Sequence, residues 1–122
     1  MKVTKTFTFD SAHNLINYNG KCEELHGHTY KLEVTVEGKP DGEGMIIDFV
    51  KLKEIVNEKV VKKLDHKYLN EVLEFNTTCE NILLWMWKEL EPVLKGDNYY
   101  LYKLRLWETP TSFAEITEKD FV

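Results

Sequence analysis

Hydrophobic and polar side chains alternate in two segments near the amino terminus. In residues 3–9 the side chains that share one face are Val3, Lys5, Phe7 and Phe9, and three threonines share the other. In residues 29–38 the apolar face carries Tyr30, Leu32, Val34 and Val36. Because side chains of a β-strand point alternately to opposite faces, each segment predicts a half-buried strand.

Two later segments carry apolar residues at helical spacing. Asp48 is a suitable N-cap for a helix that we expect to stop near Asp65, with an apolar face of Phe49, Leu52, Ile55, Val56, Val60 and Leu64. A second helix is predicted to start at residues 76–78, where Thr77 and Glu80 have the spacing of a capping box. Its apolar surface consists of Ile82, Leu83, Trp85, Met86 and Leu90.

Two more predicted strands, residues 99–107 and 113–117, end the chain, with Pro110 in the turn between them. The order is therefore ββααββ. Short links within each strand pair favour antiparallel pairing, so we predict an α+β fold with a four-stranded antiparallel sheet and two helices on one face. A length of 122 residues predicts one domain, residues 1–122, and the open sheet edges favour pairing with another subunit.

Composition and charge narrow the class of protein. The chain is 43% hydrophobic and 30% charged, as in ordinary globular domains, and its net charge of −5 argues against a nucleic-acid partner. Because there is no apolar run of signal-peptide or membrane-spanning type, we expect a cytoplasmic protein without a membrane partner. In that compartment Cys22 and Cys79 are expected to be free thiols.

The strongest local pattern is a histidine cluster. His26 and His28 are two residues apart in a predicted strand, so they project to one side, and His13 ends the neighbouring predicted strand. An isolated histidine is most often a surface or core residue. Three imidazoles together suit zinc and leave a fourth position for water or substrate, so we predict a catalytic Zn²⁺ site.

Three further features have two interpretations each. Cys22, in a polar loop beside Lys21, is either a small buried side chain or, as its placement favours, a reactive proton-transfer group. Asp65 and His66 either end a helix or form an acid–base pair. Glu108 is either a solvated turn carboxylate or an acceptor for the paired N–H donors of a heterocycle.

These residues occur within an ordered set of motifs. The set is Phe9-Asp10-Ser11-Ala12-His13, Cys22-x3-His26-Gly27-His28, Ile47-Asp48-Phe49, Leu64-Asp65-His66, Asn76-Thr77-Thr78-Cys79-Glu80-Asn81 and Trp107-Glu108-Thr109. In this order, the chain resembles the 6-pyruvoyl-tetrahydropterin synthase family from end to end. It is most similar to the bacterial and archaeal branch, the 6-carboxy-tetrahydropterin synthases of queuosine biosynthesis.

The resemblance implies a tunnelling fold (T-fold), in which three subunits join their sheets into a barrel and two trimers stack into a homohexamer. It also implies 7,8-dihydroneopterin triphosphate as substrate, with 6-carboxy-tetrahydropterin, acetaldehyde and triphosphate as products. The family's residue roles carry over by motif: zinc ligands at His13, His26 and His28, proton transfer at Cys22, Asp65 and His66, pterin anchoring at Glu108, and pocket lining at Thr77 and Thr78.

Alternative functions remain open at this point. The short spacing from Cys22 to His26 favours the queuosine branch, whereas Thr77 resembles the biopterin branch, which releases 6-pyruvoyl-tetrahydropterin. Glu23 or Glu24 is compatible with folate-type cleavage to 6-hydroxymethyl-dihydropterin. Outside these reactions stand a non-catalytic zinc module closed by Cys22 and a purine-binding protein of the same fold.

Overall fold

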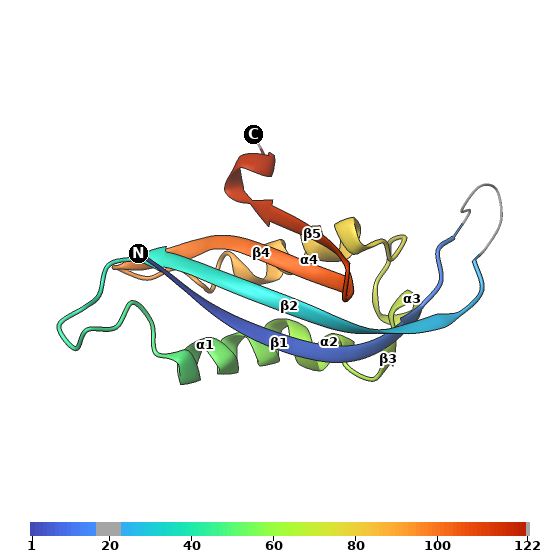
Figure 1. The fold of residues 1–122 in the computed structure, drawn as a ribbon, viewed down its shortest axis with the longest axis horizontal. Helices are drawn as coiled ribbons and strands as arrows, with labels where there is room; N and C mark the ends of the chain where they lie inside the picture. Colours follow the sequence, from blue (N-terminus) through green and yellow to red (C-terminus); the bar gives the residue numbers. More distant parts are fainter. Residues whose placement is uncertain (17–22, 122) are drawn as a thin grey trace.

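Two long strands at the start of the chain pair with each other along their whole length. In the computed structural model, which describes residues 1–16 and 23–121, β1 (Lys2–His13) runs antiparallel to β2 (His26–Gly38) (Figure 1). Their register joins Lys2 to Glu37 at one end and His13 to His26 at the other. The predicted alternation is confirmed, because Phe7, Phe9 and the four apolar residues of β2 are buried.

The remaining strands extend this hairpin into one sheet of order β3-β1-β2-β4-β5. β5 (Ser112–Thr117) pairs antiparallel with β4 (Tyr99–Thr109), as the short link between them predicted, and β4 also pairs antiparallel with β2. The strand β3 (Lys67–Tyr68) is an addition to the four predicted strands and pairs in parallel with Ser11 and Ala12. Two residues are too few to produce an alternating pattern, so the sequence carried no signal for it.

The first predicted helix is one continuous helical segment. It consists of α1 (Phe49–Val56), a π-helical stretch η1 (Asn57–Val61) and α2 (Lys62–Leu64). Asp48 is its N-cap, with a side chain that accepts a hydrogen bond of 2.8 Å from the amide of Val50. The short helix α3 (Leu69–Val72) follows β3, and a 3₁₀ turn, η2 (Glu118–Phe121), follows β5.

The second predicted helix, α4 (Cys79–Leu90), starts one residue later than the capping box required. Its N-cap is Thr78, whose hydroxyl accepts a hydrogen bond of 3.1 Å from the amide of Asn81. The predicted Thr77–Glu80 capping box is therefore wrong. Thr77 lies before the helix and is fully buried, and its carbonyl oxygen accepts a hydrogen bond from the His13 ring.

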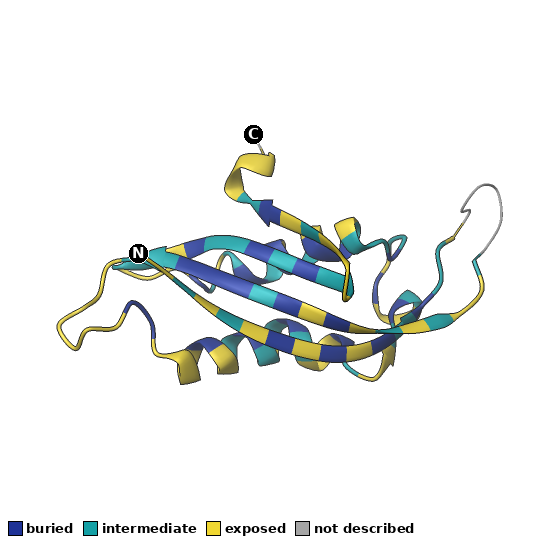
Figure 2. Cartoon of the chain, in the orientation of Figure 1, coloured by how far each residue is buried: buried dark blue, intermediate teal, exposed yellow. Residues whose placement is uncertain are grey.

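The core lies between the helices and one face of the sheet. Figure 2 shows buried and exposed bands alternating along the strands, as expected when only one face is covered. Helix residues such as Leu52 and Met86 pack in the same apolar cluster as Leu32 and Val34 of the sheet. Among the described residues, none of the helices has both the length and the apolar character needed to span a bilayer.

Candidate metal centre and active site

The three predicted metal ligands lie together at one end of the β1–β2 hairpin. His13 is the last residue of β1 and is directly opposite His26, the first residue of β2, while His28 follows on the same face. The ring centroid of His26 lies 4.7 Å from the ring centroids of both His13 and His28, and the centroids of these two rings are 5.1 Å apart. One ring nitrogen from each histidine lies within 4.8 Å of the others.

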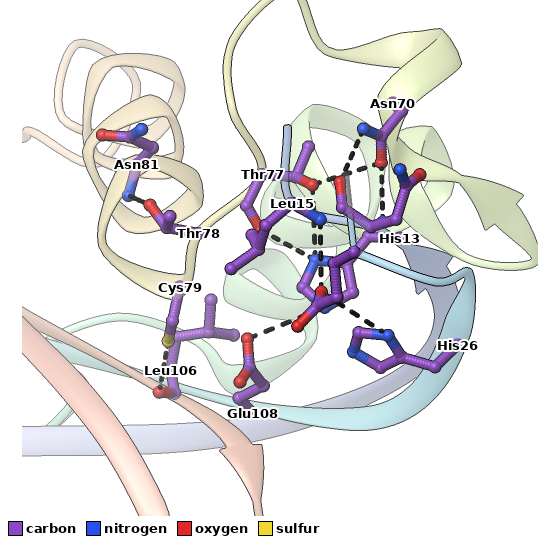
Figure 3. Close-up of polar contacts among 12 residues, drawn as sticks. His13, Leu15, His26, Asn70, Thr77, Thr78, Cys79, Asn81, Leu106 and Glu108 are labelled. Carbon is purple, nitrogen blue, oxygen red and sulfur yellow. Dashed lines mark hydrogen bonds and ion pairs between the residues drawn. The ribbon is translucent and has the colours of Figure 1, made fainter. Parts of the chain in front are cut away.

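Hydrogen bonds to carbonyl groups fix which ring nitrogens are free. The Nδ1–H of His13 donates to the carbonyl oxygen of Thr77 at 2.8 Å (Figure 3), and the Nδ1–H of His26 donates to the carbonyl oxygen of Glu24 at 3.0 Å. A carbonyl oxygen only accepts, so each Nδ1 carries a proton, and in the neutral ring the lone pair is then on Nε2. Histidines that bind metals usually donate their other N–H in this way.

Two Nε2 atoms of the cluster are buried without partners in the described part of the chain. Among the described residues, the Nε2 atoms of His13 and His28 make no hydrogen bond and are closed to solvent. Burial lowers the pKa of His28, and the neighbouring imidazoles of His13 and His26 add to this effect against the opposing charge of Glu108. An unpaired buried nitrogen is costly unless another group uses it. A converging set of three imidazoles, two of them with a buried and unpaired Nε2, therefore fits a zinc ion.

Glu108, near the end of β4, brings a carboxylate to the edge of this cluster. Its Oε2 lies 3.9 Å from Nε2 of His13, and its side chain is 29% exposed. It also lines a cavity of about 240 Å³, together with Cys79, Glu80, Ser112, Phe113 and Ala114. Glu108 thus stands between the histidines and a cavity with both polar and aromatic walls.

Cys79 and Tyr30 are the other buried polar groups near Glu108. The Cys79 thiol donates to the carbonyl oxygen of Leu106 at 3.4 Å, and burial raises its pKa to about 11, so it stays protonated (Figure 3). Burial, with smaller contributions from the charge of Glu108 and from Cys79, also raises the pKa of Tyr30 above its usual value. The Tyr30 hydroxyl has no partner among the described residues. The sequence analysis assigned Tyr30 to the apolar face of its strand, because it alternates in step with Leu32, Val34 and Val36.

Asp65 and His66 are in contact with each other, as the interpretation as an acid–base pair requires. Oδ1 of Asp65 lies 3.1 Å from Nδ1 of His66 and accepts the amide N–H of Asp10 at 3.0 Å. The Asp10 N–H, followed by the contacts with His66, lowers the pKa of Asp65. His66 is in the left-handed region with φ of 59°, and its own amide donates to the carbonyl oxygen of Asp10 at 2.7 Å.

The pair is separate from the three histidines of its own chain. Asp65 and His66 cluster with Asp10, whose exposed side chain bonds to Thr29 and alternates along β1 with the buried residues of the metal face. Asp10, Thr29 and His66 line an open hollow of about 540 Å³, and His28 is part of the same lining. The structure therefore places Glu108 at the three-histidine cluster, whereas His66 belongs to a second cluster, with Asp10 and Asp65.

The remaining predicted residues surround the histidine cluster in different ways. Thr77 contacts His13 through its carbonyl group, and the hydroxyl of Thr78 caps α4. The Glu23 carboxylate accepts the amide N–H of Leu15 at 3.2 Å and lies 3.6 Å from Nδ1 of His26. Cys22, the predicted proton-transfer residue, lies outside the described residues.

Fold and site together define an α+β domain with a candidate metal centre beside a small polar cavity. The family model of 6-pyruvoyl tetrahydropterin synthase matches residues 2–119, so the chain belongs to that family, whose members are pterin-synthesising lyases. The resemblance inferred from the motifs is thereby confirmed.

Individual relatives agree with this assignment. The chain is 34% identical, over an alignment of 142 positions, to 6-carboxy-5,6,7,8-tetrahydropterin synthase of Haemophilus influenzae, covering 96% of this chain and 99% of the relative. It is 46% identical over 101 residues to dihydroneopterin monophosphate aldolase of Pyrococcus furiosus, covering 83% of each. The structure of 6-pyruvoyl tetrahydropterin synthase from Caenorhabditis elegans superposes with a TM-score of 0.81 at 26% identity, covering 96% of this chain and 94% of the other, and the T-fold is confirmed.

Proposed function

We propose that this chain is a zinc-dependent lyase that converts 7,8-dihydroneopterin triphosphate to 6-carboxy-5,6,7,8-tetrahydropterin, acetaldehyde and triphosphate. The observation that carries the proposal is the convergence of three imidazole nitrogens within 4.8 Å, two of them buried without hydrogen-bond partners among the described residues. The end-to-end similarity to 6-carboxy-tetrahydropterin synthases supports the choice of reaction.

His13, His26 and His28 would hold the zinc ion. Zinc supplies Lewis-acid chemistry, which makes protons next to a coordinated oxygen easier to remove. Two of the rings are already oriented by hydrogen bonds to the carbonyl groups of Thr77 and Glu24. The lowered pKa of His28 keeps this ring neutral, and a neutral imidazole is the form that binds a metal.

Glu108 would anchor the pterin ring. An ionised carboxylate accepts two parallel N–H groups, and the amino and imino groups of a pterin present such a pair. Phe113 and Cys79 form less polar walls of the same cavity. Because Glu108 lies 3.9 Å from His13, a ring bound there would direct its side chain towards the three histidines.

Cys22, Asp65 and His66 would transfer protons. The lowered pKa keeps the Asp65 carboxylate ionised, so it can accept a hydrogen bond from the His66 ring, 3.1 Å away, and orient it. The separation of His66 from the histidines of its own chain supports a site shared between subunits, with His66 serving the neighbouring metal centre. This arrangement agrees with the homohexamer that we infer from the family.

A second candidate function is folate-type cleavage to 6-hydroxymethyl-dihydropterin. One specific observation favours it: the Glu23 carboxylate lies 3.6 Å from the His26 ring, where it could act as a general base beside the metal. The 46% identity to a dihydroneopterin monophosphate aldolase points in the same direction.

Product analysis separates these functions. The zinc-loaded protein is incubated with 7,8-dihydroneopterin triphosphate, and in parallel with the monophosphate, and the pterins are identified by mass spectrometry. The proposal predicts 6-carboxy-tetrahydropterin from the triphosphate. Formation of 6-hydroxymethyl-dihydropterin would favour the second candidate, and 6-pyruvoyl-tetrahydropterin, or no turnover at all, would contradict the proposal.

A further inference from the structure

A network of amide side chains surrounds the end of β1, next to His13. Its centre is Asn70 of α3, which makes hydrogen bonds through both ends of its side-chain amide. Oδ1 of Asn70 accepts the backbone N–H of Asn14 at 3.1 Å, and Nδ2 donates to the backbone carbonyl of Asn14 at 2.8 Å. Asn70 therefore holds the peptide groups on both sides of Asn14, the residue that directly follows His13.

The same side chain also reaches the residue that orients the His13 ring. The hydroxyl of Thr77 donates to Oδ1 of Asn70 at 3.3 Å, and the carbonyl oxygen of Thr77 accepts the Nδ1–H of His13 at 2.8 Å (Figure 3). Thr77 and His13 are both buried, with 0% and 2% of their surface exposed. Solvent is thus excluded from this part of the network, and hydrogen bonds lost there are not replaced by water.

A third contact ties the same chain segment to β1. The hydroxyl of Tyr68, in β3, donates to the side-chain oxygen of Asn14. The segment that contains Tyr68 and Asn70 begins with Asp65 and His66, which bond to the backbone of Asp10. One short segment, residues 65–70, therefore forms hydrogen bonds on both sides of His13, with Asp10 before it and with Asn14 after it.

We propose that Asn70 is a positioning residue for the metal centre. By holding Asn14 and Thr77 in place, Asn70 keeps the His13 ring fixed with its Nε2 directed towards His26 and His28. The inference rests on the proposed function in one respect, which is that His13, His26 and His28 are taken as the zinc ligands.

Zinc affinity tests this role without relying on enzyme activity. Removal of a group that orients a metal ligand typically weakens metal binding by roughly 10–100-fold. We expect a loss of that size for Asn70→Ala in a competition assay with a coloured chelator. The visible spectrum of the cobalt-substituted protein should also change, because it reports the geometry of the ligand set.

Asn98 offers a matched control at the opposite end of the sheet. Its side-chain amide donates to the carbonyl oxygens of Lys39, Ile46 and Met45, at 2.8, 3.1 and 3.5 Å. Asn98→Ala therefore also loses hydrogen bonds between chain segments and should lower the melting temperature of the metal-free protein. It should leave zinc affinity and the cobalt spectrum unchanged.

Two results would overturn the positioning role: wild-type zinc affinity in Asn70→Ala, or an equal loss of affinity in Asn98→Ala. If Asn70→Ala does not fold, Asn70→Leu makes the same comparison, since leucine has nearly the shape of asparagine and makes none of its hydrogen bonds to Asn14 and Thr77. Weaker zinc binding in the Leu variant supports the role, and equal binding contradicts it. Failure of the wild type to bind zinc contradicts the proposed function itself.

Discussion

At the scale of the residue, the site depends on groups whose protonation the surroundings control. The Nδ1 atoms of His13 and His26 are committed to carbonyl oxygens, so the Nε2 atoms remain available for a metal. Cys79 is kept protonated by burial, which makes it part of the cavity wall and not a nucleophile. Binding and proton transfer therefore belong to different residues, and variants can separate them.

Glu108→Ala should weaken substrate binding, because the N–H donors of the ring would lose a charged acceptor worth ~1.5–3 kcal/mol. Cys22→Ala should do the opposite, abolishing turnover while zinc content and substrate binding persist. Calorimetry with the substrate, together with metal analysis, measures both effects. Near-normal turnover of Cys22→Ala, combined with an inactive Glu23→Ala, would contradict the role of Cys22 and favour folate-type cleavage.

Asp65 should make stability depend on pH in a defined direction. Its pKa in the folded protein is below the usual value of 3.8, mainly because it accepts the N–H of Asp10. The unfolded chain therefore binds the proton more tightly, and the stabilisation is present above about pH 4 and lost as the pH falls through the folded pKa. The melting temperature of Asp65→Asn should lie below that of the wild type at neutral pH and approach it in acid. A difference that does not change with pH would contradict this account.

At the scale of the element, alternation and helical spacing predicted the strands and helices that pack one face against the core. The four long strands and two main helices each place apolar residues on a single face, and that pattern is visible without tertiary information. The start of α4 was misplaced because Thr77 and Thr78 are equally good caps locally. The bond between His13 and the carbonyl of Thr77, 64 positions apart in the chain, is a tertiary contact that no local pattern contains.

The difference between local patterns and tertiary contacts also explains which residues of the candidate site were predicted. His13, His26 and His28 were predicted together because strand pairing follows from the pattern. Asn70 was missed, since its role arises from contacts across 56 residues with Asn14 and no motif marks it. The left-handed backbone of His66 was missed for a similar reason, because bonds to Asp10 of β1 hold it there.

Thr78→Ala should destabilise the protein by ~1 kcal/mol, the usual effect of removing a helix N-cap. Thr78→Ser keeps the hydroxyl that accepts from Asn81 and should be nearly neutral. Chemical denaturation of the metal-free protein measures both. If Thr78→Ala were no more destabilising than Thr78→Ser, the assignment of the cap to Thr78 would be wrong.

At the scale of the whole molecule, the separation of the acid–base pair from the metal centre predicts function through assembly. If His66 of one subunit serves the histidines of another, a Cys22→Ala chain and a His66→Ala chain are each inactive alone. Mixed oligomers of the two should regain part of the activity, because some sites then contain both intact groups. Light scattering gives the oligomeric state of the mixture, and a fully active monomer would contradict this arrangement.

The most direct test of the central claim is acetaldehyde released from 7,8-dihydroneopterin triphosphate before and after zinc is removed with a chelator. We predict that the zinc-loaded enzyme forms acetaldehyde and 6-carboxy-tetrahydropterin in equal amounts. The stripped enzyme should form neither until zinc is restored, and a His26→Ala/His28→Ala variant should not recover. Undiminished release from the stripped enzyme, or turnover of the pterin without acetaldehyde, would contradict the account.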